Sequence, residues 1–207
     1  VLNCGDGRFH QGSAGVLDVA EDAGLASCTA LFASAGLPLS LQADMRAVLW
    51  GKLLLNLNNA INALSGVPLK AELSQRAYRR CLSLAQREAL GLYALAGITP
   101  MQLTALPPRW LARLLTVPDW LFQRLAQRML AMDPLARSSM WEDLEAGRRT
   151  EVDWIQGEVV QLAAELGATA PVNACLVALI REAEQAGTAR QAWSGDELLA
   201  RLRAASA

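Results

Sequence analysis

WGKLLLNLNNAINAL, residues 50–64, is the stretch from which the rest of the chain is best interpreted. Its apolar spacing predicts a helix, which at 3.6 residues per turn places Lys52, Asn56 and Asn59 within an arc of roughly 60°. The leucines around them, together with Ile61, predict that this polar stripe is set into a core. A buried lysine is costly unless a partner or a ligand pairs with it, so the stripe predicts a binding site.

The same stripe also has ordinary structural explanations. A helical lysine commonly extends to solvent, and asparagines are frequent at surfaces and helix caps. Four asparagines between residues 56 and 62 weigh against these explanations, because asparagine is a poor helix former that packing or function must offset. On the same helical geometry Asn58 points away from Lys52, and Asn62 lies at the flank of the stripe.

Composition describes a globular protein. The 207 residues are 53% hydrophobic with a formal net charge of −1, which excludes a disordered chain, and the absence of a basic run argues against nucleic acid as a partner. Every apolar run is far shorter than the ~20 residues that a membrane-spanning helix needs. The widely spaced cysteines and the single histidine, His10, predict no metal site and no disulfide framework. Free thiols in a reducing cytoplasm are the expectation.

Glycines punctuate residues 1–20, and this pattern predicts a β-hairpin or two edge strands. Gly5-Asp6-Gly7 begins like a dinucleotide-binding loop, but the third glycine of that motif is absent, so a turn is predicted instead. His10 is predicted to be a strand residue rather than a general base. The chain opens in mid-pattern without a methionine or a signal peptide, and we expect it to be the remainder of something longer.

Helical spacing takes over from residue 21 and predicts a mainly α fold of about eight helices. Prolines cut residues 101–135 into short helices whose tryptophan-rich strip, Trp110 to Met129, is typical of a core or an interface. Thr150 is predicted to cap a helix that has Glu151 in its first turn. The tail after Gly187 predicts a short polar helix. The longer helices are expected at residues 22–35, 44–65, 72–96, 150–167 and 171–185.

Ser139 and Glu151 complete a candidate constellation. Each has a structural explanation by itself, Ser139 as a helix cap and Glu151 as a first-turn acid. Together with Lys52, Asn56 and Asn59 they predict a donor-rich pocket with a single ion pair. Such a pocket suits a small hydroxylated carboxylate.

Two motifs carry a family resemblance. WGKLLLNLNNAINALSG, followed by ARSSMWEDLEAGRRTEVDWIQGEVV, resembles the C-terminal half of the ketopantoate reductases, which are NADPH-dependent 2-dehydropantoate 2-reductases. GRFHQGSAGVL resembles the end of that family's nucleotide domain. The resemblance implies a remnant β segment at 1–20, a helical substrate domain at 21–187 similar to the C-terminal domains of 6-phosphogluconate-dehydrogenase-like enzymes, and a helical tail at 188–207. It also implies a homodimer.

The resemblance also implies roles for the candidate residues. Lys52 matches the lysine that acts as general acid, and Glu151 matches the glutamate that lies near it. Asn56, Asn59 and Ser139 match the residues that bind the 2-keto acid. The family spaces its lysine and two asparagines four residues apart, whereas position 60 here is Ala60, which leaves Asn62 as the rival of Asn59.

The family's glycine-rich nucleotide domain has no counterpart in this sequence. We therefore expect the chain alone to bind NADPH weakly and to lack reductase activity. The alternative interpretation is a non-catalytic helical module that associates with itself or with a partner, left by the loss of the nucleotide domain.

Overall fold

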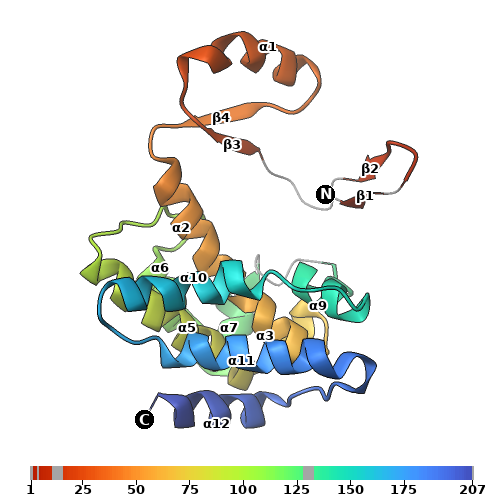
Figure 1. Ribbon diagram of the computed structural model, residues 1–207, viewed down its shortest axis with the longest axis vertical. Coiled ribbons are helices and arrows are strands. Elements are labelled where there is room, and N and C mark those ends of the chain that lie inside the picture. Colours follow the sequence, from red (N-terminus) through yellow and green to blue (C-terminus); the bar gives the residue numbers. More distant parts are fainter. Residues whose placement is uncertain (1, 4, 11–15, 128–132, 207) are drawn as a thin grey trace. The chain divides into compact units, whose positions relative to one another are not determined.

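The computed structural model describes residues 2–3, 5–10, 16–127 and 133–206. The protein is mainly α-helical with short β elements near its N-terminus, which confirms the predicted fold class (Figure 1). It divides into two compact units, Val1–Leu49 and Trp50–Ala207. Among the described residues, no helix combines the length and the apolar character that are needed to cross a membrane.

The first unit begins with a hairpin of two antiparallel strands, β1 (Leu2–Asn3) and β2 (Phe9–His10). The N–H of Arg8 donates to the carbonyl of Gly5 at 2.9 Å, which closes a turn. Both central residues, Asp6 and Gly7, have positive φ, as the tight turns of hairpins require. The predicted turn is therefore confirmed, and so is the strand assignment of His10.

A strand, a helix and a second strand follow in the first unit. The two strands run parallel in register, with Leu17 opposite Leu39 and Ala20 opposite Gln42. The second strand was not predicted, because a run of four residues after Pro38 is too short to show alternation. The elements are β3 (Leu17–Ala20), the 3-10 turn η1 (Ala23–Leu25), α1 (Ala26–Ser34) and β4 (Leu39–Gln42).

Helices from distant parts of the sequence build the core of the second unit. Helix α11 (Pro171–Ala186) packs against both α10 (Val152–Glu165) and α12 (Gly195–Ala205), and α12 packs against α5 (Arg76–Leu95) (Figure 1). Helix α2 (Met45–Asn56) begins before the boundary between the units and ends after it. The other helices within the described residues are α3 (Asn58–Ser65), α4 (Leu69–Leu73), α6 (Pro108–Leu114), α7 (Asp119–Leu125) and α9 (Ser139–Glu145).

The tail was predicted to form a short polar helix, but the C-terminal helix α12 contributes buried leucines to the core. Leu198 and Leu202 are fully buried in the same core as α5 and α11. Ser194 caps the helix together with Glu197 in a reciprocal capping box. The charged residues of this tail occupy its outer face, so its composition concealed an amphipathic helix.

Prolines start the short helices as predicted, since Pro108 is the first residue of α6 and Pro118 caps α7. The tryptophan-rich strip between them is divided by burial. Phe122 is fully buried, whereas Trp110 and Trp120 are 54% and 69% exposed. Met129, the end of the predicted strip, lies outside the described residues.

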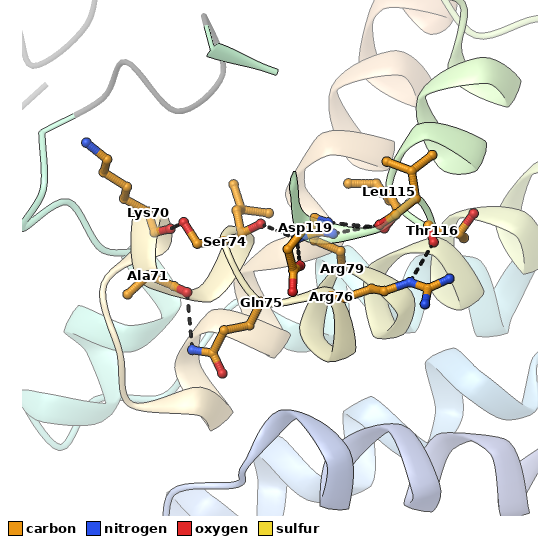
Figure 2. Close-up of polar contacts among 11 residues, drawn as sticks. Lys70, Ala71, Ser74, Gln75, Arg76, Arg79, Leu115, Thr116 and Asp119 are labelled. Carbon is orange, nitrogen blue, oxygen red and sulfur yellow. Dashed lines mark hydrogen bonds and ion pairs between the residues drawn. The ribbon is translucent and has the colours of Figure 1, made fainter. Parts of the chain in front are cut away.

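Arg79 of α5 joins α5 to the segment between α6 and α7 (Figure 2). Its guanidinium is fully buried, pairs with Asp119 at 2.8 Å and lies 4.1 Å from the centre of the Phe122 ring. Burial lowers the pKa of Arg79, and the hydrogen bond that Arg79 donates to Asp119 opposes that shift. The remaining donors reach the carbonyls of Leu73, Leu115 and Val117.

Candidate active site

Lys52 lies near the C-terminal end of α2 with its side chain exposed. The prediction that apolar residues enclose it is therefore wrong. Gly51 and Leu54 form the buried face of this turn, and an added Cβ at Gly51 would lie 2.4 Å from the carbonyl oxygen of Met101. This close approach turns the glycine inward and the next residue, Lys52, outward. No ion pair or hydrogen bond engages the Lys52 ammonium within the part of the chain that the structure describes.

Lysine is scarce in this sequence, because Lys52 and Lys70 are its only lysines. Apart from His10, the other basic residues are arginines, whose guanidinium keeps its proton under all ordinary conditions. An ammonium can release a proton to a reacting group, which a guanidinium cannot do. The rarity of lysine was therefore a signal in the sequence that strengthens the case for Lys52.

The predicted helix over residues 44–65 is broken at Leu57 into α2 and α3. Two fully or nearly buried glutamines bind the backbone at the break. Gln86 of α5 donates to the carbonyl of Leu54 at 3.0 Å, and Gln156 of α10 donates to that of Leu57 at 2.9 Å. Side chains distant in sequence thus stabilise the break, which is why local spacing did not predict it.

The four asparagines of this region divide into two pairs. Asn58 and Asn62 are buried and both donate to the carboxyl of Glu72, at 3.3 and 2.9 Å. Asn56 and Asn59 are half-buried, and their side-chain amides form no hydrogen bond with the described residues. Asn58 and Asn62 are therefore engaged in hydrogen bonds within the protein, and the amides of Asn56 and Asn59 are available to a ligand.

Asn62 was the rival of Asn59 for the second substrate-binding position. It is fully buried, and both ends of its side-chain amide form hydrogen bonds within the protein. Its Nδ2 donates to Glu72 and to the carbonyl of Val67 at 2.9 Å, and its Oδ1 accepts the N–H of Ser138 at 2.9 Å. This arrangement leaves Asn62 no capacity for a ligand, whereas Asn59 retains its own.

Glu72 is the acid at the centre of this group. Its side chain is fully buried in α4, and burial raises its pKa to about 8, an effect that the hydrogen bonds from Asn62 and Asn58 only partly offset. The carboxyl is therefore mostly protonated at neutral pH. Sequence reasoning missed Glu72, because a single acid on a short helix gives no signal of burial.

Ser139 is the first residue of α9, and its side chain is exposed. The helix cap suggested for Ser139 is its neighbour Ser138, whose Oγ accepts the N–H of Trp141 at 3.2 Å. The Ser138 hydroxyl also donates to the carbonyl of Asn59 at 3.2 Å. The structure therefore brings the backbone of Asn59 and the start of α9 together, and it leaves the Ser139 hydroxyl unoccupied by described residues.

Glu151 is exposed and stands immediately before α10, one residue later than the predicted cap. Thr150 still contributes, since its Oγ1 accepts the N–H of Val152 at 3.3 Å. The acid within the first turn is Asp153, which pairs with Arg181 at 2.7 Å. Glu151 has no side-chain partner among the described residues, and no direct contact joins it to Lys52 there.

The described residues do not form a dinucleotide cradle or a metal centre. Gly5-Asp6-Gly7 is the turn of a hairpin and does not precede a helix N-terminus, as a phosphate-binding loop must. No group of three metal-ligating side chains comes together within residues 2–3, 5–10, 16–127 and 133–206. Of the candidate residues, Lys52 and Asn56 lie in the last turns of α2 before the break, and Asn59 and Ser139 are brought together by the hydrogen bond from Ser138 to the Asn59 carbonyl. No contact joins Glu151 to any of them among the described residues.

Comparisons with known proteins bear on the family and the fold of the chain. The family model described as "Ketopantoate reductase PanE/ApbA C terminal" matches residues 44–184. A 2-dehydropantoate 2-reductase of Halobacterium salinarum is 29% identical over 169 residues, which cover 81% of this chain and 50% of the relative. The chain thus spans about half the length of that relative.

Solved structures show the same fold. A PanE/ApbA family ketopantoate reductase from Ralstonia eutropha JMP134 superposes with a TM-score of 0.65 at 25% identity, covering 83% of this chain and 52% of that one. A dimeric ketopantoate reductase from Staphylococcus aureus superposes with a TM-score of 0.59 at 16% identity, covering 81% of this chain and 53% of that one.

Proposed function

The chain belongs to the ketopantoate reductase PanE/ApbA C-terminal family, and we propose that it is the substrate-binding and catalytic half of an NADPH-dependent 2-keto-acid reductase. The substrate that we propose is 2-dehydropantoate, reduced to pantoate on the route to pantothenate and coenzyme A. The name of the Halobacterium salinarum relative supports this choice. Because the chain spans about half of that relative, we propose that NADPH binds mainly to residues outside this chain.

One observation carries the proposal. Lys52, Asn56, Asn59, Ser139 and Glu151 have no side-chain partner among the described residues. Neighbouring residues in the sequence form the stabilising hydrogen bonds instead, as Ser138 does when it caps α9 next to Ser139. Polar side chains that packing does not use are available for a ligand.

Lys52 supplies the proton in this proposal. Hydride addition to the carbonyl carbon of a 2-keto acid leaves an alkoxide on the carbonyl oxygen. An ammonium within hydrogen-bond reach stabilises that charge and then transfers a proton to the oxygen, which yields the 2-hydroxy acid and a neutral amine that solvent reprotonates. The exposed and unpaired ammonium of Lys52 is suited to this role.

The other candidates bind and orient the substrate. The amides of Asn56 and Asn59 and the hydroxyl of Ser139 each offer donors and acceptors to hydroxyl, carbonyl and carboxylate groups. Glu151 is proposed to approach Lys52 when substrate is bound and to favour its protonated form, since a nearby carboxylate stabilises an ammonium. The hydrogen bond from Ser138 to Asn59 supports a shared position for Asn59 and Ser139.

Lys52→Arg tests the acid role. Arginine keeps the positive charge but not the transferable proton, so kcat for ketopantoate should fall ~10²–10⁴-fold, the range for a lost general acid, while KM changes little. The assay is NADPH oxidation by the full-length protein, meaning the proposed reductase that contains this chain together with the residues that bind NADPH. Lys70→Arg is the matched control, since Lys70 is also exposed on a helix, and it should leave kcat unchanged. A Lys52→Arg variant with normal kcat would exclude the acid role.

The alternative function is a helical association module, which the exposure of Trp110 and Trp120 favours. Combined alanine substitutions at Lys52, Asn56, Ser139 and Glu151 separate the two functions. Turnover should vanish if these residues carry catalysis, and intact turnover would favour the module. Calorimetry with NADPH on the 207-residue chain provides a second test, because we expect weak binding and no reductase activity from it.

We extend the proposal to a homodimer in the cytoplasm. The dimeric Staphylococcus aureus reductase supports the dimer, and the free thiols of Cys81 and Cys175 support a reducing compartment. Light scattering coupled to size-exclusion chromatography measures the oligomeric state directly. A monomer at micromolar concentration would contradict the dimer without affecting the proposed chemistry.

A further inference from the structure

We propose that Glu72 is a positioning residue for the substrate site, acting through Asn62 and Ser138 on the helix turns that carry Asn59 and Ser139. This inference rests on the function proposed above. It adds to the site a buried residue that has no access to substrate, since the side chain of Glu72 is fully buried.

A continuous series of hydrogen bonds joins Glu72 to the site. Asn62 of α3 donates from Nδ2 to Glu72 Oε2 at 2.9 Å, and its Oδ1 accepts the N–H of Ser138 at 2.9 Å. The hydroxyl of Ser138 donates to the carbonyl of Asn59 at 3.2 Å and accepts the N–H of Trp141 at 3.2 Å. Three helices, α4, α3 and α9, are thereby fixed to one another at the position of the candidate residues.

Glu72 also sets the rotation of α3 about its axis. Asn58 and Asn62 are one helical turn apart and lie on one face, and both donate to the same carboxyl oxygen. Asn59 follows Asn58 by one residue, so anchoring the Asn58–Asn62 face at Glu72 directs Asn59 about 100° away from it. Asn59 is half-buried and unoccupied as a result.

The orientation of the Asn62 amide depends on the acid. A carboxamide has a donor end and an acceptor end, and Ser138 requires the acceptor end. Glu72 and the carbonyl of Val67 accept from the donor end, so together they fix which end faces Ser138. Loss of the carboxyl leaves one of these two acceptors and weakens that choice.

Other contacts allow the fold to survive the loss of Glu72. The N–H of Leu69 donates to the carbonyl of Ala136 at 2.9 Å, and Arg137 donates to the carbonyl of Gly66 at 2.9 Å. These bonds hold the chain before α9 against the turn between α3 and α4. A variant without the carboxyl, such as Glu72→Ala, should therefore lose local order at Ser138 and retain the helical bundle.

The test compares Glu72→Ala with Glu72→Gln and with Glu88→Ala in the full-length protein. Glu88 is the matched control, because its carboxyl also accepts from a buried asparagine, Asn173 at 2.7 Å, and from the first turn of α11. Glu72→Ala should raise KM for ketopantoate about tenfold or more with little change in kcat, the effect of misplaced binding groups. Glu72→Gln keeps the acceptor and should restore KM, and Glu88→Ala should leave KM unchanged.

Amide hydrogen exchange gives a readout that is independent of activity. Exchange of the Ser138 N–H should accelerate about tenfold or more in Glu72→Ala and remain slow in Glu72→Gln and Glu88→Ala. Should Glu72→Ala not fold, Ser138→Ala removes the last link of the same series, the hydroxyl that binds the Asn59 carbonyl and the Trp141 N–H. It carries the same expected rise in KM, and an unchanged KM would overturn the positioning role of the series.

The outcomes separate this inference from the proposed function. If KM and the exchange of Ser138 in Glu72→Ala match those of Glu88→Ala, the positioning role of Glu72 is overturned while the proposed reductase stands. If the wild-type protein does not reduce ketopantoate, the proposed function and the substrate part of this inference are overturned together. Exchange of Ser138 then still decides whether Glu72 fixes α9.

Discussion

Replacing Glu72 with glutamine should remove a loss of stability that the buried carboxyl imposes as pH rises. Burial raises the pKa of Glu72 from 4.5 to about 8. Each pKa unit corresponds to about 1.4 kcal/mol of differential stability between the two protonation states. Glutamine is close to a protonated glutamate in shape and is neutral at every pH, so the variant isolates this contribution.

The sign follows from proton binding in the two states. Between pH 4.5 and about 8 the folded protein holds the proton of Glu72 while the unfolded chain releases it. The free energy of unfolding therefore falls with increasing pH by about 1.4 kcal/mol per unit in this window. Between pH 5.5 and 7.5 the wild-type protein should lose about 3 kcal/mol relative to Glu72→Gln. Tyr78 and Cys81 interact electrostatically with Glu72, but their ordinary pKa values already lie above this window and burial raises them further. Neither group therefore titrates in the window.

Urea unfolding followed by tryptophan fluorescence measures this difference. Wild type and Glu72→Gln are compared at pH 5.5, 6.5 and 7.5, where every other titrating group contributes equally to both proteins. The difference between their free energies of unfolding should grow steadily with pH. A difference that stays constant, or that shrinks as pH rises, would refute the assignment of a protonated carboxyl at Glu72.

Three further predictions concern single positions. Asn59→Ala should raise KM with little effect on stability, whereas Asn62→Ala should lower the melting temperature, because it leaves buried partners unpaired at about 1–3 kcal/mol. Gly51→Ala should destabilise the protein by about 1–3 kcal/mol in thermal unfolding, because its Cβ would lie 2.4 Å from a backbone oxygen. Gly91→Ala is the control, since Gly91 lies on an open helix face, and it should be neutral or stabilising in the same assay. Arg79→Met should cost about 3–5 kcal/mol in urea unfolding, because it leaves three carbonyls without their buried donor, at about 1–3 kcal/mol for each buried group. The loss of the pair with Asp119 should add little, since that carboxylate is 52% exposed.

The sequence predicted the helical class and many element positions because caps, prolines and apolar spacing are local signals. Asp44 begins α2 as expected, with its Oδ1 accepting the N–H of Ala47 at 2.9 Å. Strand β4 was missed, since its pairing partner is a distant strand and it is short. The break at Leu57 was missed for a related reason, because the glutamine at position 156 that binds there is ninety-nine residues away.

The candidate site was predictable in its residue types but not in its environment. Resemblance and helical geometry selected Lys52 and Asn56, and both remain predictions that the structure makes physically reasonable. Burial could not be obtained from the sequence, so the lysine was expected in a core and is exposed. The choice between adjacent residues also required the structure, because the sequence does not show which of the two serines caps α9. The hydrogen bond from the Trp141 N–H identifies Ser138 as the cap, and the Ser139 hydroxyl has no partner among the described residues.

The two glutamines at the helix break impose a constraint on natural variation. Gln86 and Gln156 each use only the donor end of the amide, and the oxygen at the other end has no partner among the described atoms. A glutamine codon becomes a glutamate codon by a single base change, but a carboxylate at either position would face a carbonyl oxygen in a buried setting. Working members of this lineage should therefore tolerate neutral residues here far more often than glutamate.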